Sequence, residues 1–152
     1  MMLTLTCPDE TDTRAAGARL AALLRPGDVV VLAGELGCGK TVFAGGLADG
    51  LGIERPVTSP SFVLVRTYDD GFLPLVHVDV YRLGSLAEFE DLEVLEFADT
   101  GVAVIEWGEA VAVELPADHL VVRFDVHEDE SRTLRFEPHG VWNVRNLPEV
   151  LG

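Results

Sequence analysis

The sequence predicts an α/β fold of three layers, with a mixed, partly parallel sheet and a β-hairpin near the C-terminus. The run Asp28–Ala33 is apolar and rich in valine, which is typical of a strand buried on both faces. A glycine-rich loop and a helical pattern follow it, and later apolar runs alternate with helical segments, which favours this fold class. The chain has 152 residues, 48% of them hydrophobic and 24% charged, so a single globular domain over residues 1–152 is expected.

Periodicity and turn residues predict the other elements. Apolar residues at helical spacing predict a helix over Thr11–Leu24, which Pro26-Gly27 ends, and helices over Lys40–Leu51 and the acidic stretch Leu86–Phe97. The residues from Trp142 onward carry no pattern that assigns them. The remaining apolar runs predict five strands: Phe62–Tyr68, Leu75–Tyr81, Val102–Trp107, His119–Val126 and Thr133–Glu137. Turn residues within the first and the last pair of these strands predict two hairpins.

The formal net charge of −15 argues against one broad class of function. Nucleic-acid binding draws most of its affinity from lysine and arginine side chains against phosphates. This chain has no stretch rich in basic residues, and Lys40 is its only lysine. We therefore do not expect it to hold RNA or DNA alone.

Location and thiol state follow from two simpler features. No apolar run is long enough to span a bilayer, and the N-terminus lacks a basic start followed by an apolar stretch. The sequence therefore predicts a cytoplasmic protein without membrane contact. Cys7 and Cys38 are expected to be free thiols, because a crosslink at Cys38 would obstruct the glycine loop and a closed metal site needs about four ligands.

The glycine loop Gly34–Thr41 has the pattern G-x-x-x-x-G-K-[ST] of a phosphate-binding P-loop. Its glycines permit the backbone N–H groups to face a polyphosphate, and the following helix points its positive end at the same phosphates. Lys40 would add a charge near the β- and γ-phosphates, and Thr41 would offer its hydroxyl to Mg²⁺. The loop lies between a buried strand and a helix, as an NTPase P-loop requires. The candidate nucleotide-binding residues are Gly34, Glu35, Leu36, Gly37, Cys38, Gly39, Lys40, Thr41 and Val42.

A P-loop enzyme also needs an acid near the Mg²⁺, usually at the end of a neighbouring strand. Asp79 and Glu106 each follow an apolar run that is predicted to be a strand. Either acid could instead mark only the point where a strand meets solvent. His77 and Trp107 lie nearby in sequence, but a histidine there is more often a structural hydrogen-bonding group, and a tryptophan after a strand is often part of the core.

Three further motifs accompany the loop: Val57–Phe62 (VTSPSF), His77–Leu83 (HVDVYRL) and Val104–Trp107 (VIEW). In their order and spacing, the four motifs resemble the TsaE family. These are small bacterial ATPases required for threonylcarbamoyladenosine modification of tRNA. The resemblance extends from Pro8 to about Arg132, and four motifs in register are far more specific than the loop alone.

The resemblance implies roles for particular residues. Lys40 and the loop would hold the phosphates of ATP, while Thr41 and Glu106 would hold Mg²⁺. Asp79 would be the acid most needed for hydrolysis, by orienting the attacking water. Trp107 would lie beside the nucleotide.

Weaker matches to the family concern the rim of the site. Thr13 and Arg132 would contact the nucleotide, and residues 58–62 would form a loop that responds to the γ-phosphate. The chain departs from the family pattern without losing a charged or metal-binding group, at Glu35, Cys38 and Gly108.

The resemblance also implies partners. An ATPase of this family does not perform the carbamoyl transfer; it binds the threonylcarbamoyl transferase and that enzyme's companion subunit, and hydrolysis permits repeated turnover. The partners would hold the tRNA, so this acidic chain would meet tRNA only indirectly.

Three other functions remain open on the residues alone. A small-metabolite kinase would need cationic side chains clustered around the acceptor, and the arginines are scattered. A GTPase would need a guanine-recognition element resembling Asn-Lys-x-Asp, which the sequence lacks. A nucleotide-dependent docking module with negligible hydrolysis would share every motif and would differ only in the role of Asp79.

Overall fold

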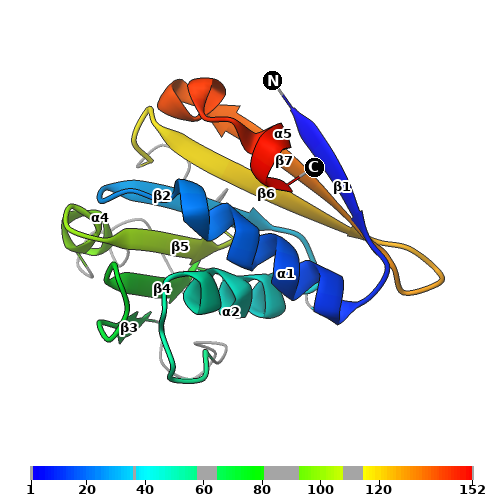
Figure 1. Cartoon of the computed structure of the whole chain (residues 1–152), viewed down its shortest axis with the longest axis horizontal. Coiled ribbons are helices and arrows are strands. Elements are labelled where there is room, and N and C mark those ends of the chain that lie inside the picture. Colours follow the sequence, from blue (N-terminus) through cyan, green and yellow to red (C-terminus); the bar gives the residue numbers. More distant parts are fainter. Residues whose placement is uncertain (1, 36, 58–64, 81–92, 108–114, 152) are drawn as a thin grey trace.

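The computed structural model describes residues 2–35, 37–57, 65–80, 93–107 and 115–151. Its strands are β1 (Leu3–Cys7), β2 (Asp28–Ala33), β3 (Val65–Tyr68), β4 (Leu75–Asp79), β5 (Val102–Glu106), β6 (His119–Val126) and β7 (Arg132–His139). Its helices are α1 (Glu10–Leu20), α2 (Lys40–Gly50), α4 (Val94–Ala98) and α5 (Leu147–Leu151), with 3-10 helices η1 (Ala21–Leu23) and η4 (Gly140–Val144). The strands form a seven-stranded sheet in the order β1-β7-β6-β2-β5-β4-β3 (Figure 1).

The sheet is mixed, as predicted. At its centre β4, β5, β2 and β6 run parallel to one another. Towards its edges β3 pairs antiparallel with β4, β7 with β6, and β1 with β7. The β6–β7 pair is the predicted C-terminal hairpin. Because the central strands are parallel, their carboxyl ends meet at the same edge of the sheet.

Side chains of the central strand alternate between two apolar layers. Val30 and Leu32 of β2 belong to a core shared with α1 and α2, whereas Val29 and Val31 belong to a second core shared with α4. Figure 1 shows α1 and α2 side by side against one face of the sheet. Helices thus cover both faces, which confirms the predicted three layers. No helix among the described residues has both the length and the apolar character needed to cross a membrane.

Two glycines bring α1 and α2 into close contact. A Cβ on Gly46 would lie 2.0 Å from the carbonyl oxygen of Arg14, and a Cβ on Gly17 would lie 2.3 Å from that of Phe43. A larger residue at either position would force the helices apart. The contact therefore fixes α2, which follows the glycine loop directly, against α1.

The strand β1 has no counterpart among the predicted elements. It is five residues long, with Leu3 and Leu5 half-buried and Thr4 and Thr6 exposed, so its own apolar pattern is weak. Its partner is β7, near the other end of the chain. Local sequence could not reveal this strand, because the pairing that stabilises it is not local.

Element ends also differ from the predicted ones. The first helix ends at Leu20, because its last turn tightens into η1. The previously unassigned C-terminal residues form η4 and α5. Parts of the predicted elements Phe62–Tyr68, Leu75–Tyr81 and Leu86–Phe97 lie outside the described residues.

A buried ion pair anchors the C-terminal segment to the start of β2. Arg145 Nη1 lies 2.6 Å from Asp28 Oδ2, and both side chains are 7% exposed. The same guanidinium lies over the Trp142 ring, 4.3 Å from its centroid, and donates to the carbonyl of Leu23. The backbone N–H of Arg25 donates to the Asp28 carboxylate. Because both charged side chains are buried away from water, each depends on the other for its stabilisation.

We expect Asp28→Asn to lower the free energy of unfolding by about 3 kcal/mol, the lower end of the cost of breaking a buried ion pair, because the asparagine oxygen still accepts a hydrogen bond. Asp49→Asn is the matched control: it removes a half-exposed carboxylate that lies 2.6 Å from Arg14 Nε, and such pairs contribute at most about 1 kcal/mol. Urea unfolding followed by circular dichroism measures both changes. If both variants lost the same free energy of unfolding, burial would not be what makes the Asp28–Arg145 pair important.

Candidate functional site

The glycine loop leaves the end of β2 and turns into α2. Gly34, Gly37 and Gly39 have φ angles of 150°, 79° and 104°, which residues other than glycine rarely adopt. A Cβ on Gly34 would also lie 3.0 Å from the carbonyl oxygen of Phe124 in β6. The loop therefore needs glycine for its backbone path and, at Gly34, for space as well.

Helix α2 begins directly after this loop. Gly39 caps the helix in a left-handed conformation, without a side-chain hydrogen bond. The first intrahelical bond runs from the N–H of Phe43 to the carbonyl of Gly39. N–H groups of a first helical turn, here those of Thr41 and Val42, have no acceptor within the helix. Together with the helix dipole, such N–H groups favour negative charge.

Lys40 is folded back over the loop and is 4% exposed. Its Nζ donates a hydrogen bond to the carbonyl oxygen of Gly34 at 2.5 Å, and it lies 3.4 Å from the centroid of the Trp107 ring. A carbonyl and an aromatic face thus share one ammonium group. An anion in the loop would compete with both for that charge.

The two candidate acids meet at the edge of the sheet next to the loop. The strand register pairs Asp79 of β4 with Glu106 of β5, and it pairs Glu106 with Leu32 of β2. Alternate residues of a strand share a face of the sheet, so Leu75 lies on the same face as Asp79, and Val104 on the same face as Glu106. Leu75 and Val104 lie in the core beneath α2. Both carboxylates therefore lie on the sheet face that α2 covers. They are also buried, with Asp79 5% and Glu106 4% exposed.

The carboxylate oxygens at this edge are the kind of ligand that Mg²⁺ prefers. Mg²⁺ prefers oxygen ligands and is usually held by one or two carboxylates together with substrate phosphates and waters. Glu106 Oε2 lies 2.5 Å from His77 Nε2, which leaves Oε1 as the carboxylate oxygen that His77 does not hold. Among the described residues no group of three or more His, Cys, Asp or Glu could hold a metal by itself. The Glu106 carboxylate at this edge thus has the chemistry of a Mg²⁺ ligand that shares the ion with phosphate.

Thr13 and Arg132 flank the loop from opposite ends of the chain. A Cβ on Gly39 would lie 3.6 Å from both Thr13 Cγ2 and Arg132 Nε. Arg132 donates to the carbonyl oxygens of Cys38 at 3.3 Å and Gly37 at 3.4 Å. Thr13 is buried and donates from its hydroxyl to the carbonyl of Asp9 at 3.3 Å. The structure thus brings both predicted residues to the loop, with Arg132 bonded to the loop backbone.

Both cysteines are free, as predicted, and both are buried. Burial raises the pKa of the Cys38 thiol above its usual value, although the nearby Lys40 charge opposes this. Burial likewise raises the pKa of the Cys7 thiol. Neither residue is therefore an activated thiolate at neutral pH.

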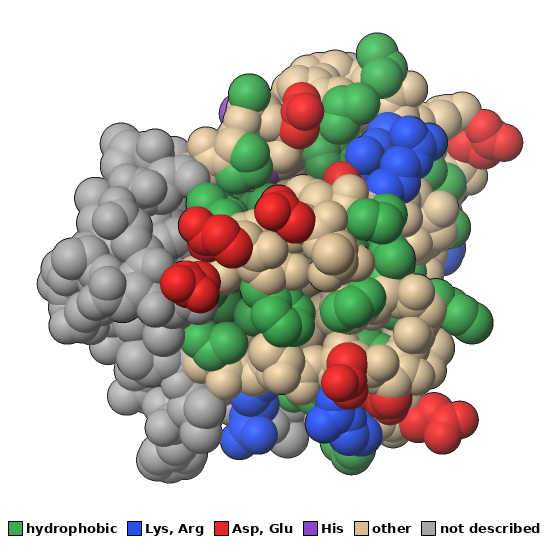
Figure 2. All heavy atoms as spheres, turned by 90° about the vertical axis from the view of Figure 1, so that its left-hand side faces the viewer, with side chains coloured by type: hydrophobic (Ala, Val, Ile, Leu, Met, Phe, Trp, Pro, Cys, Tyr) green, Lys and Arg blue, Asp and Glu red, His purple; other side chains and the backbone are tan. Residues whose placement is uncertain are grey.

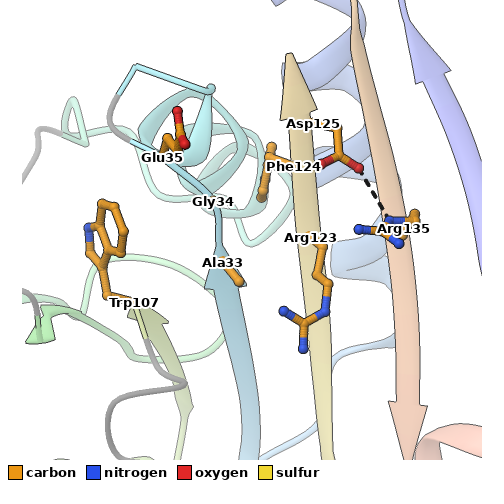
Figure 3. Close-up of a pocket in the computed structure, with 8 residues that line it drawn as sticks. All are labelled: Ala33, Gly34, Glu35, Trp107, Arg123, Phe124, Asp125 and Arg135. Carbon is orange, nitrogen blue, oxygen red and sulfur yellow. Dashed lines mark ion pairs between the residues drawn. The ribbon is translucent and has the colours of Figure 1, made fainter. Parts of the chain in front are cut away.

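A hollow of about 310 Å³ lies beside the loop (Figure 3). Trp107, at the end of β5, stands on one side of it, and Phe124 and Asp125 of β6 stand on the other, with Ala33 between them. A second hollow of about 330 Å³ shares Gly34, Glu35, Phe124 and Asp125 with the first and extends to Cys38 and Val126. The loop is thus accessible along the β6 side.

Sequence reasoning missed the hairpin residues that line this hollow. Arg135 Nε pairs with Asp125 Oδ2 at 3.3 Å, and Arg123 pairs with Glu137. No motif includes these residues. The alternation of charged with apolar residues in both strands of the hairpin could have indicated a polar outer face, but not its position beside the loop.

Several predicted site residues lie outside the described residues. These are Leu36 of the loop, residues 58–62, residues 81–83 of the histidine motif, and Gly108.

Comparisons with known proteins identify the family to which the chain is similar. The family model "Threonylcarbamoyl adenosine biosynthesis protein TsaE" matches residues 7–134. The tRNA threonylcarbamoyladenosine biosynthesis protein TsaE of Bacillus subtilis is 42% identical over 130 residues, which cover 85% of this chain and 81% of that protein. Its namesake in Streptomyces coelicolor is 52% identical over 116 residues, 74% of this chain and 78% of that protein.

A solved structure supports the same relationship. The crystal structure of YdiB from Bacillus subtilis superposes with a TM-score of 0.81 at 35% identity, covering 99% of this chain and 94% of YdiB. Agreement in sequence and in fold extends over most of the chain, and on this evidence the chain belongs to the TsaE family.

Proposed function

We propose that this protein binds and hydrolyses ATP with Mg²⁺ in the formation of threonylcarbamoyladenosine in tRNA, and that it acts on a transferase complex rather than performing the transfer. One observation carries the ATPase part of the proposal. The parallel register brings Asp79 and Glu106 together beside a glycine loop whose lysine and helix start both favour an anion. The similarity to tRNA threonylcarbamoyladenosine biosynthesis proteins supports the tRNA part.

Each residue would have a separate task. The loop, Lys40 and the start of α2 would bind the phosphates. Thr41 and Glu106 would hold Mg²⁺, which when bound neutralises charge on the transferring phosphoryl group. Asp79, buried next to Glu106, would accept a proton from the attacking water or orient it.

The parts of the nucleotide beyond the phosphates would lie along the rim of the loop. Thr13 and Arg132 flank Gly39 at the start of α2. Trp107 faces Lys40 and lines the hollow opposite the residues of β6. These groups would bind the nucleoside through apolar contacts and hydrogen bonds. The acids of β4 and β5 would serve the metal and the attacking water.

The distribution of charge supports an indirect relation to tRNA. Figure 2 shows the end of the molecule where α4 lies, and there acidic side chains are spread over the face while basic ones stand apart from one another. With a net charge of −15, the chain would repel phosphates outside its glycine loop. A transferase and its companion subunit would therefore hold the tRNA.

We expect purified protein to hydrolyse Mg²⁺-ATP slowly alone and faster with the cognate transferase complex. Lys40→Ala should reduce the stimulated rate at least about 100-fold, since the ammonium group stabilises charge on the phosphates. Asp79→Ala should reduce it about 10²- to 10⁴-fold while sparing ATP binding. A rate that is equal with and without the complex would argue for another client. Unchanged hydrolysis in Asp79→Ala would exclude its catalytic role, and ATP binding without any hydrolysis would favour a docking module.

The Lys40–Trp107 contact predicts an optical signal. Tripolyphosphate in the loop should draw Lys40 Nζ from the Trp107 ring, so tryptophan emission should change on its addition. Trp107→Phe should abolish the change, whereas the buried Trp142 remains as an unchanged background. Lys40→Met is the second control. If it keeps the full change in emission, displacement of the ammonium group is not the cause.

A further inference from the structure

His77 is a buried polar residue to which the proposed function assigns no task. It lies on β4 two residues before Asp79, and its side chain is fully buried. Its Nε2 lies 2.5 Å from Glu106 Oε2 on the neighbouring strand. Its other ring nitrogen, Nδ1, is buried and has no hydrogen-bond partner among the described residues.

The contact follows from the strand register. β4 and β5 pair His77 with Val104, and Asp79 with Glu106. His77 therefore reaches Glu106 diagonally, from a position one step deeper in the sheet than the carboxylate. A carboxylate that binds Mg²⁺ is ionised and can only accept a hydrogen bond, so beside the metal Nε2–H would donate and Glu106 Oε2 would accept.

A purely structural histidine would be a poor choice at this position. Burial of a polar atom without a partner costs stability, and an apolar side chain of similar size would not carry the buried Nδ1. What the imidazole adds is the bond from Nε2 to Glu106. That bond restrains a long carboxylate side chain which could otherwise adopt other rotamers at the end of β5.

We propose that His77 is a positioning residue for the metal site: its Nε2–H holds Glu106 Oε2, so that the Glu106 carboxylate is already oriented when Mg²⁺ and the nucleotide bind. The proposal rests on the proposed function, since it takes Glu106 as a ligand of Mg²⁺. Hydrogen-bonded partners of metal ligands act in this way, and their loss typically lowers metal affinity about 10- to 100-fold.

Two amide variants separate this role from a general effect of burial. In His77→Gln the side-chain nitrogen is as many bonds from Cβ as Nε2 is, so it can still donate to Glu106. In His77→Asn the nitrogen takes the place of Nδ1 and falls short of Glu106. The two variants bury the same chemical group and differ by one methylene.

The measurement is Mn²⁺ binding to the full-length protein saturated with ADP, followed by electron paramagnetic resonance. ADP binding in EDTA is measured by calorimetry alongside it. We expect His77→Asn to weaken Mn²⁺ binding about 10- to 100-fold, while ADP binding in EDTA stays as in the parent. His77→Gln should restore Mn²⁺ binding towards the parent value.

Different failures have different meanings. If the Asn and Gln variants bind Mn²⁺ alike, or if ADP binding in EDTA falls as much as Mn²⁺ binding, His77 does not position Glu106 and the inference is overturned. If the parent protein saturated with ADP does not bind Mn²⁺, the proposed function itself fails. Thermal unfolding of both variants identifies a loss of folding, which a positioning role does not require.

Discussion

Hydrogen bonds of the parallel ladder pair Leu32 of β2 with Glu106 of β5, and Glu106 with Asp79 of β4. The rest of the site depends on this register. A slip of one residue in either pairing would turn a carboxylate to the opposite face of the sheet, away from α2 and from the loop that precedes it. The apolar residues of both strands specify the register, because each face of the sheet packs against its own core.

A buried charged group lies at each end of the strand β2. At its start, Asp28 is held by Arg145 from the C-terminal segment. At its end, the ammonium group of Lys40 is held by the Gly34 carbonyl and the Trp107 ring. The first arrangement is a closed pair and contributes to the fold. The second places the ammonium group beside the glycine loop, where the proposed function has it bind phosphate.

Local sequence was enough for the elements nearest the site. The valine-rich run of β2, the glycine motif and the apolar pattern of α2 each lie within one short segment, and all three were predicted with ends that agree closely with the structure. Asp79 and Glu106 were found because each ends an apolar strand. The strand β1 was missed, because its stabilising partner lies in β7. The lining of the hollow was missed for the same reason, since Arg123, Asp125 and Arg135 reach the loop only through pairing of the hairpin with the sheet.

By itself the sequence determined the chemistry available to this protein: a glycine loop, one lysine, a hydroxyl at the helix start, and acids at two strand ends. These follow from residue type and short spacing, which a sequence displays directly. The tertiary structure decided which groups meet. Strand register, a property of two distant segments together, placed Glu106 beside Asp79 and within reach of His77, and helix packing through Gly17 and Gly46 fixed α2 over that edge.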